Sequence, residues 1–87
     1  MIHYFVLGKM LYEWVELQLY SVASQFGEHK LSISQFDHYL EGLSEKCSTV
    51  LKCFDLVGNP SPFEEMIIKS TIGIKSSTEK VRKSLRG

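Results

Sequence analysis

Apolar residues recur at alternating intervals of three and four positions through the middle third of the chain. The series is Ile33, Phe36, Leu40, Leu43, Cys47, Val50, Phe54 and Val57. Because this spacing keeps one stripe of a helix on the same side, it predicts a long helix over residues 33–57 that packs lengthwise against other helices. Ser32 and Gln35 are spaced as a capping box at its start, and Gly58–Asn59–Pro60 marks its end.

The first 26 residues carry two apolar rows, which predicts a helix over about residues 2–25 that is apolar around most of its circumference. One row comprises Phe5, Gly8, Tyr12, Val15, Leu19, Val22 and Phe26. The second comprises Tyr4, Leu7, Leu11 and Trp14, widened by Met10 and Leu17. Gly27 is expected to end this helix in the left-handed conformation that glycine favours. Lys9, Glu13 and Glu16 interrupt the apolar run, so no membrane span is expected.

A third helix is predicted over about residues 62–85. Ser61 is suited to the N-cap, Pro62 to the first helical position and Glu64 to the third. Several β-branched residues and a glycine make a strand over 66–75 the alternative. A helix is favoured because it keeps four apolar residues on one face, namely Phe63, Ile67, Ile74 and Val81. The end of this helix is expected to fray after about Ser77.

These segments predict an all-α fold over residues 1–87, a single domain built as an antiparallel three-helix bundle with heptad packing. The bundle is expected to be oligomeric, because two helices of similar length cover only about half of the first one. The second row is therefore predicted to bind a protein partner or another copy of the chain, through Tyr4, Leu7, Met10, Leu11, Trp14 and Leu17. The alternative is that this helix lies wedged between the other two.

Charge is distributed unevenly along the chain, although 10 basic and 10 acidic residues cancel. Residues 1–60 are net acidic and residues 61–87 are net basic. A basic end can contact phosphates or an acidic partner, here through Lys75, Lys80, Arg82, Lys83 and Arg86. The alternative is a solvated helix end whose cations complement the helix dipole. A net charge of zero is unlike a dedicated nucleic-acid binder, so nucleic acid is not the favoured partner.

Residues that carry catalysis are arranged in no familiar motif. The sequence has no glycine-rich phosphate loop and no nucleophile elbow, and its histidines and cysteines lack zinc-ligand spacing. We therefore expect no enzymatic activity, no cofactor and no metal. Cys47 and Cys53 are too far apart on one helix to bridge, at about 9 Å between their Cα atoms. Free thiols favour a reducing compartment, hence a cytoplasmic location.

His38 and Gly42 lie one turn apart on the side of the predicted helix that faces away from its apolar stripe. The stretch from His38 to Ser44 resembles the phosphoacceptor segment of histidine phosphotransfer domains, which are helical bundles with a glycine four residues after the histidine. Glu41 stands where that family has a lysine. The resemblance implies that His38 carries a phosphoryl group and that Gly42 makes room for a partner. The alternative is an ordinary surface histidine beside a tolerated glycine.

The function favoured by this pattern is a non-enzymatic protein–protein interaction module that binds through the apolar face of the first helix. Small adaptors, inhibitors, immunity proteins and secretion-type chaperones are of this kind. A phosphotransfer protein using His38 and a nucleic-acid-binding regulator using the basic end remain the alternatives.

Overall fold

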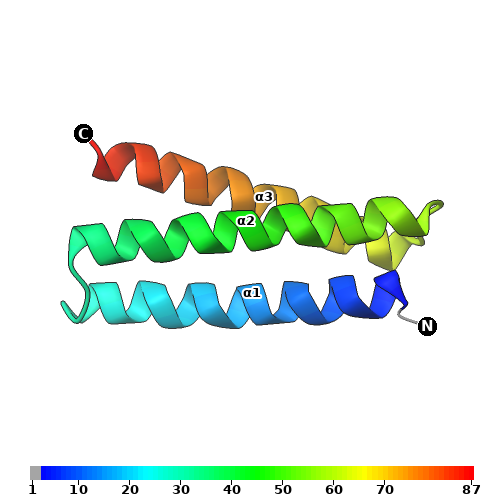
Figure 1. Ribbon diagram of the computed structural model, residues 1–87, viewed down its shortest axis with the longest axis horizontal. Helices are drawn as coiled ribbons and strands as arrows, with labels where there is room; N and C mark the ends of the chain where they lie inside the picture. The colour runs from blue at the N-terminus through cyan, green and yellow to red at the C-terminus, as the bar shows by residue number, and fades with distance from the viewer. Residues whose placement is uncertain (1–2) are drawn as a thin grey trace.

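The computed structural model describes residues 3–87 and consists of three helices joined by two short loops (Figure 1). Helix α1 spans Tyr4–Gly27, α2 spans Ile33–Val57 and α3 spans Pro62–Leu85. Consecutive helices run antiparallel, and residues 3–87 contain no strand, so the predicted all-α three-helix bundle is confirmed and the alternative strand is wrong. The predicted start of the first helix at Ile2 lies outside the described residues. The bundle measures 41 × 22 × 19 Å.

The starts of α2 and α3 are defined by capping boxes. The Ser32 hydroxyl accepts a hydrogen bond from the Gln35 backbone N–H at 3.1 Å, and the Gln35 side chain accepts one from the Ser32 backbone N–H at 2.9 Å. Ser61 and Glu64 form the same reciprocal pair at the start of α3. Each box satisfies two backbone donors that the first turn leaves free, and both helices begin at the residue predicted.

The end of α1 differs from the prediction. Gly27 is still helical, and the residue in the left-handed region is His29, with φ of 63°. The backbone N–H of Lys30 donates to the Gln25 carbonyl at 2.9 Å and that of His29 donates to the Phe26 carbonyl at 3.0 Å. This pair of bonds is a Schellman motif, in which the left-handed residue follows the helix by two positions. Gly27 therefore contributes the last turn and His29 the reversal.

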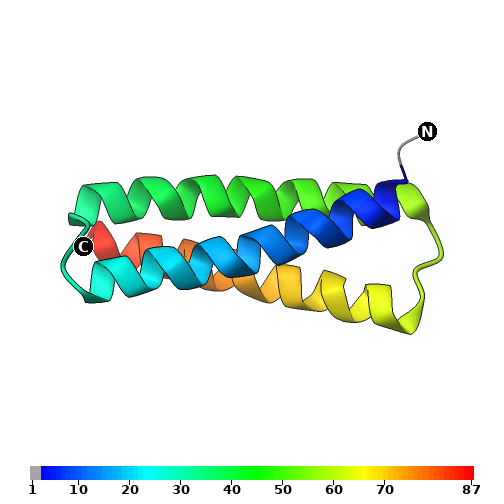
Figure 2. The same ribbon diagram turned by 90° about the horizontal axis from the view of Figure 1, so that it is seen from below.

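Helix α2 packs along its length against both other helices and lies between them in the view of Figure 1. In the view of Figure 2, α1 and α3 cross each other and separate toward the right-hand end. Helices α1 and α3 approach each other at only a few positions. The alternative that the first helix lies in the middle is therefore wrong. Two groups of buried side chains line the central helix, one around Leu40 and Cys47 and one around Phe54. Six of the eight apolar residues in the predicted α2 series are buried, and its two ends, Ile33 and Val57, are exposed.

Helix α3 is rotated relative to the prediction. Phe63 and Val81, predicted to face the core, are 48% and 41% exposed. Ile67 is buried as predicted and Ile74 packs partly against the core, but the rest of the buried face is formed by Thr71, Thr78 and Arg82. The two threonine hydroxyls donate to backbone carbonyls one turn earlier in the same helix, so their burial leaves no polar atom without a partner. The helix is continuous to Leu85, beyond the predicted fraying point.

Candidate functional site

The face of α1 that packs on α2 is set by a close approach at Gly8. A Cβ atom at this position would lie 3.0 Å from the Phe54 ring and 3.1 Å from the Cys53 Cβ, so the backbone of α1 packs there directly against side chains of α2. Val15 and Val22 continue the contact and are almost fully buried. This face corresponds to the first predicted row of α1, and packing on it turns the second row away from the core.

Five residues of the second row remain exposed and form what we call the α1 strip: Tyr4, Leu7, Met10, Trp14 and Leu17. Their exposed fractions run from 42% for Leu7 to 70% for Leu17. Leu11, predicted as a sixth member, packs partly against the Phe54 cluster instead. The strip occupies the N-terminal half of the helix, and only the last part of α1, from about Ser21, is polar on this side.

A groove of about 230 Å³ borders the strip where α1 meets α2. We call it the α1–α2 groove; its walls are Trp14, Gln18, Val22, His38, Tyr39, Gly42, Leu43 and Lys46. Trp14 from the predicted binding face and the predicted His38–Gly42 pair therefore lie in one place. Sequence reasoning missed Tyr39 and Lys46, which complete the groove. A signal for Tyr39 was available in the sequence, since it is an aromatic residue outside the α2 series and directly follows His38; in the structure it is 50% exposed.

Gly42 leaves the groove open. A Cβ atom added at Gly42 would meet nothing within 4 Å, so packing within the chain does not require a glycine there. His38 is exposed beside it. Glu41, one position earlier, is bound to Arg82 at 2.8 Å. The phosphoacceptor role of His38 stays a prediction.

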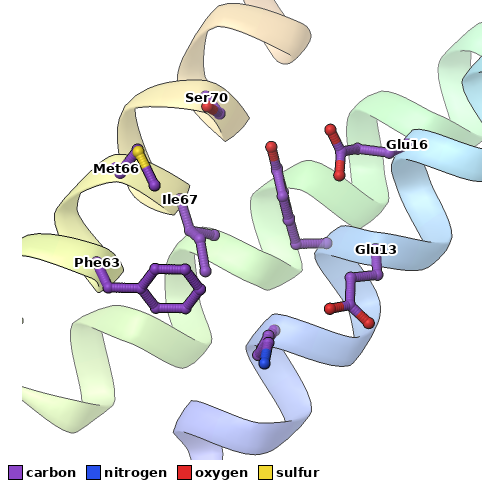
Figure 3. A pocket seen from close by; sticks show the side chains of 8 residues that line it. Glu13, Glu16, Phe63, Met66, Ile67 and Ser70 are labelled. Atoms are coloured by element: carbon purple, nitrogen blue, oxygen red, sulfur yellow. The ribbon is translucent and has the colours of Figure 1, made fainter.

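A second groove, of about 330 Å³, lies between α1 and α3, where these helices diverge (Figure 3). Figure 3 shows Glu13 and Glu16 on one wall and Phe63, Met66 and Ser70 on the other. The Lys9 ammonium lies 5.6 Å from the centre of the Phe63 ring, within range of a cation–π contact. Tyr12 forms part of the floor, and its burial raises the pKa of the phenol.

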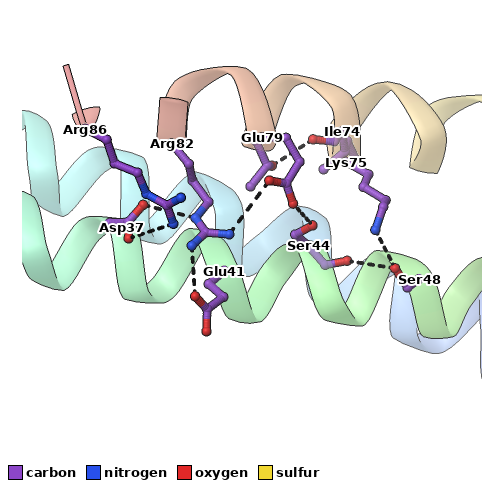
Figure 4. Close-up of polar contacts among 10 residues, drawn as sticks. Asp37, Glu41, Ser44, Ser48, Ile74, Lys75, Glu79, Arg82 and Arg86 are labelled. Carbon is purple, nitrogen blue, oxygen red and sulfur yellow. Dashed lines mark hydrogen bonds and ion pairs between the residues drawn. The ribbon is translucent and has the colours of Figure 1, made fainter. Parts of the chain in front are cut away.

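The basic end of α3 docks onto the acidic face of α2 in the same chain (Figure 4). The Arg82 guanidinium donates to Asp37 at 3.0 Å and to Glu41 at 2.8 Å, and its side chain is only 10% exposed. Arg86 lies 3.8 Å from Asp37, and the Lys75 ammonium donates to the Ser48 hydroxyl at 2.6 Å.

Three of the five basic residues predicted to contact a phosphate or an acidic partner, Lys75, Arg82 and Arg86, therefore have partners on α2. Lys80 and Lys83 are exposed, and nothing in residues 3–87 forms an ion pair with them. The nucleic-acid role of this end stays a prediction.

The same contacts shift the acid–base equilibria of the cluster. The hydrogen bond from Arg82 holds the pKa of Asp37 below its usual value, and Asp37 in turn raises the pKa of Arg82. The Ser44 hydroxyl donates to Glu79 and lowers the pKa of that carboxyl. These shifts favour the charged forms of Asp37, Glu79 and Arg82 at neutral pH, and the cluster holds α3 against α2.

Other chemistry is sparse over residues 3–87. Cys47 and Cys53 are free and buried, and burial raises the pKa of the Cys47 thiol, which disfavours the reactive thiolate. Nowhere in this range do three His, Cys, Asp or Glu side chains gather closely enough to hold a metal ion. None of the three helices, as far as they are described, combines the length and hydropathy needed to cross a bilayer. Comparisons of the chain with protein-family models, curated proteins and solved structures gave no significant match.

Proposed function

We propose that this chain is a non-enzymatic protein–protein interaction module whose binding surface is the α1 strip together with the α1–α2 groove. The observation that carries the proposal is the row of five apolar side chains, each at least 42% exposed, on a helix whose opposite face is used by the core. Contiguous exposed apolar surface bordered by polar residues marks interaction sites in proteins of known function. A small adaptor, inhibitor, immunity protein or secretion-type chaperone would use such a surface.

The arrangement has the features of an energetic centre in an interface. Trp14 lies between strip and groove, with 43% of its surface still available to a partner. Tryptophan and tyrosine at the middle of a contact contribute most of the binding free energy in many interfaces, and Tyr39 stands across the groove. Both residues lie on helices rather than loops, so the backbone that carries them loses little conformational entropy on binding.

Charged residues on the two borders would orient the partner. Glu13 and Glu16 lie on the border toward α3, and Lys46 lies on the border toward α2. Exposed charges of this kind affect the association rate and the orientation of a complex more than its affinity.

The test compares two matched substitutions, Leu17→Glu in the strip and Ile72→Glu on α3. Both residues are exposed, at 70% and 52%, so neither change is expected to unfold the chain, which circular dichroism checks. Wild type and variants are immobilised through the C-terminus, and the proteins retained from a host extract are identified and their stoichiometry is measured. The proposal predicts a stoichiometric complex, with itself or another protein, that Leu17→Glu loses and Ile72→Glu keeps. A complex unaffected by Leu17→Glu, or no complex at all, would contradict it.

A further inference from the structure

We infer that the partner on the α1 strip is a second copy of this chain, with the two α1 helices side by side and parallel. This inference rests on the proposed function, because it uses the same strip, and it adds the identity of the occupant and its orientation.

The exposed area is the first reason. A compact protein of this mass exposes about 5,200 Å² by the general scaling of surface with mass. The chain, at 10.0 kDa, exposes 6054 Å². The excess of about 800 Å² is close to the area that each partner buries in an interface of standard size. This elongated bundle, which measures 41 × 22 × 19 Å, therefore exposes enough surface to give up the area of one interface to a second copy.

The spacing of the strip is the second reason. Leu7, Met10, Trp14 and Leu17 follow one another at intervals of three, four and three, which is the spacing of the contact positions in a two-stranded coiled coil. Two such rows can pack knobs into holes without further adjustment. The formal net charge of the chain is zero, so two copies do not repel each other overall.

The two borders of the strip differ, and the difference selects the parallel orientation. Tyr20, at 80% exposed, is the most exposed large hydrophobic residue in the range 3–87, and it lies on the border opposite the α1–α2 groove. Gln18 and Val22 line that groove, so the groove and Tyr20 lie at the same height along α1.

When two helices pack in parallel, each border of one faces the opposite border of the other. Tyr20 of each copy then enters the groove of its neighbour above Gly42, and Glu13, which borders the strip between Met10 and Leu17, faces the side of the neighbour that carries Lys46. Both contacts form twice around the two-fold axis, so the dimer is closed. Antiparallel packing would instead bring Glu13 close to Glu13 of the other copy, and the two carboxylates would repel each other. It would also place the two grooves against each other, so that neither groove receives Tyr20.

Gly42 lies where this contact requires a close approach. Glycine is less favourable than alanine inside a helix, and this one has open space where a Cβ would lie. Gly73 is equally open, but Gly42 differs from it because it lines the α1–α2 groove, where the Tyr20 ring of a neighbouring copy would rest on its backbone.

The test measures mass by sedimentation equilibrium for the full chain and for Gly42→Leu, Tyr20→Ser and Gly73→Leu. Wild type should sediment at twice 10.0 kDa. Gly42→Leu and Tyr20→Ser should raise the dissociation constant on the order of tenfold or more, since each removes a central contact. Gly73→Leu is the control, because Gly73 also faces open space but lies on α3. Thermal unfolding should show that both glycine variants stay folded. Wild type that remains at 10.0 kDa up to about 1 mM would overturn the inference, as would a dimer indifferent to Gly42→Leu and Tyr20→Ser.

Orientation is tested by oxidation of Leu17→Cys. In the parallel dimer residue 17 faces its own counterpart, so a disulfide should link the copies, whereas in an antiparallel dimer it faces Leu7 and no disulfide forms. Cys47 and Cys53 are 0% and 5% exposed and do not compete. The charge exchange Glu13→Lys with Lys46→Glu should restore an affinity that either single change lowers. Absence of the disulfide in a confirmed dimer would overturn the parallel arrangement.

The inference and the proposed function can fail separately. A monomeric wild type that still forms a complex with another protein, lost in Leu17→Glu and kept in Ile72→Glu, overturns the second copy and leaves the interaction module standing. A chain with no strip-dependent complex of any kind contradicts both.

Discussion

The two sides of α2 are built differently. Toward α1 the contact is apolar: Phe26 stacks on Phe36 with ring centres 4.1 Å apart and planes within 4°, and Gly8 lies against Phe54. Toward the second half of α3 the contact is polar, with Arg82 bound to Asp37 and Glu41. Within residues 3–87, every ion pair between helices joins α2 to α3.

This difference separates the contact that stabilises the fold from the contact that sets the position of α3. Burial of apolar surface is favourable whatever the exact geometry, at about 25 cal/mol per Å². Partly exposed ion pairs add little net free energy, because desolvation offsets their attraction, yet they tolerate only one arrangement of donors and acceptors. The apolar α1–α2 contact therefore supplies stability, and the polar part of the α2–α3 contact fixes the register and rotation of α3.

The largest expected effect is that of Phe36→Ala. Phe36 is 7% exposed and stacked on Phe26, so its truncation should lower the free energy of unfolding by about 3–5 kcal/mol. Arg82→Met, which keeps the buried stem and removes the charge, should lower it much less. Urea unfolding followed by circular dichroism measures both. Equal losses would show that the two contacts do not differ as described.

A smaller effect is expected at Gly8, where the backbone of α1 packs directly against the Phe54 and Cys53 side chains. Gly8→Ala should destabilise by about 1–3 kcal/mol, because the added methyl group meets Phe54 and a Cys53 Cβ that cannot move independently of α2. Gly73→Ala adds the same group in open space and should stabilise by about 0.5–1 kcal/mol through better helix propensity. Thermal unfolding of the pair checks the signs, and a stabilising Gly8→Ala would refute the close approach.

The smallest effect concerns pH and only the polar contact. Because the pKa of Asp37 is lower in the folded chain than in the unfolded one, the unfolded state takes up its proton first as the pH falls. The contribution of Asp37 to stability is complete at neutral pH. It declines once the pH falls below the ordinary pKa of aspartate, about 4, and it is lost below the lowered pKa of the folded chain. Glu79 contributes with the same sign. The urea midpoint should therefore fall less steeply between about pH 5 and pH 2 in Asp37→Asn than in wild type. Parallel curves would mean that Arg82 does not bind Asp37 in solution.

Periodicity was sufficient to predict the parts of the fold that depend on local sequence. The three-helix architecture, both capping boxes and the buried face of α1 follow from spacing and from Ser32 and Ser61. The rotation of α3 could not be predicted in this way, because a hydrophobic pattern favours Phe63 and Val81 over the threonines. Thr71 and Thr78 can be buried because their hydroxyls donate hydrogen bonds to backbone carbonyls of their own helix. Arg82 can be buried because Asp37 and Glu41 on α2 accept hydrogen bonds from its guanidinium.

The candidate surface was predictable only in part. The exposed row on α1 was expected, yet Leu11 turned inward because the path of α1 near Gly8 brings it to the Phe54 cluster. The groove depends on how α1 and α2 are offset along the long axis of the bundle. No sequence feature within a single helix encodes this offset. That offset is what places His38 and Gly42 beside Trp14.

Trp14 is the only tryptophan of the chain, and it lies at the candidate surface with 43% of its area open to water. Its intrinsic fluorescence is consequently a label that needs no chemistry. Coverage by any occupant should move the emission to shorter wavelength and protect the indole from a collisional quencher such as iodide. Titrating the unmodified chain in a fluorimeter thus reports on the contact directly, at concentrations far below those that scattering methods require.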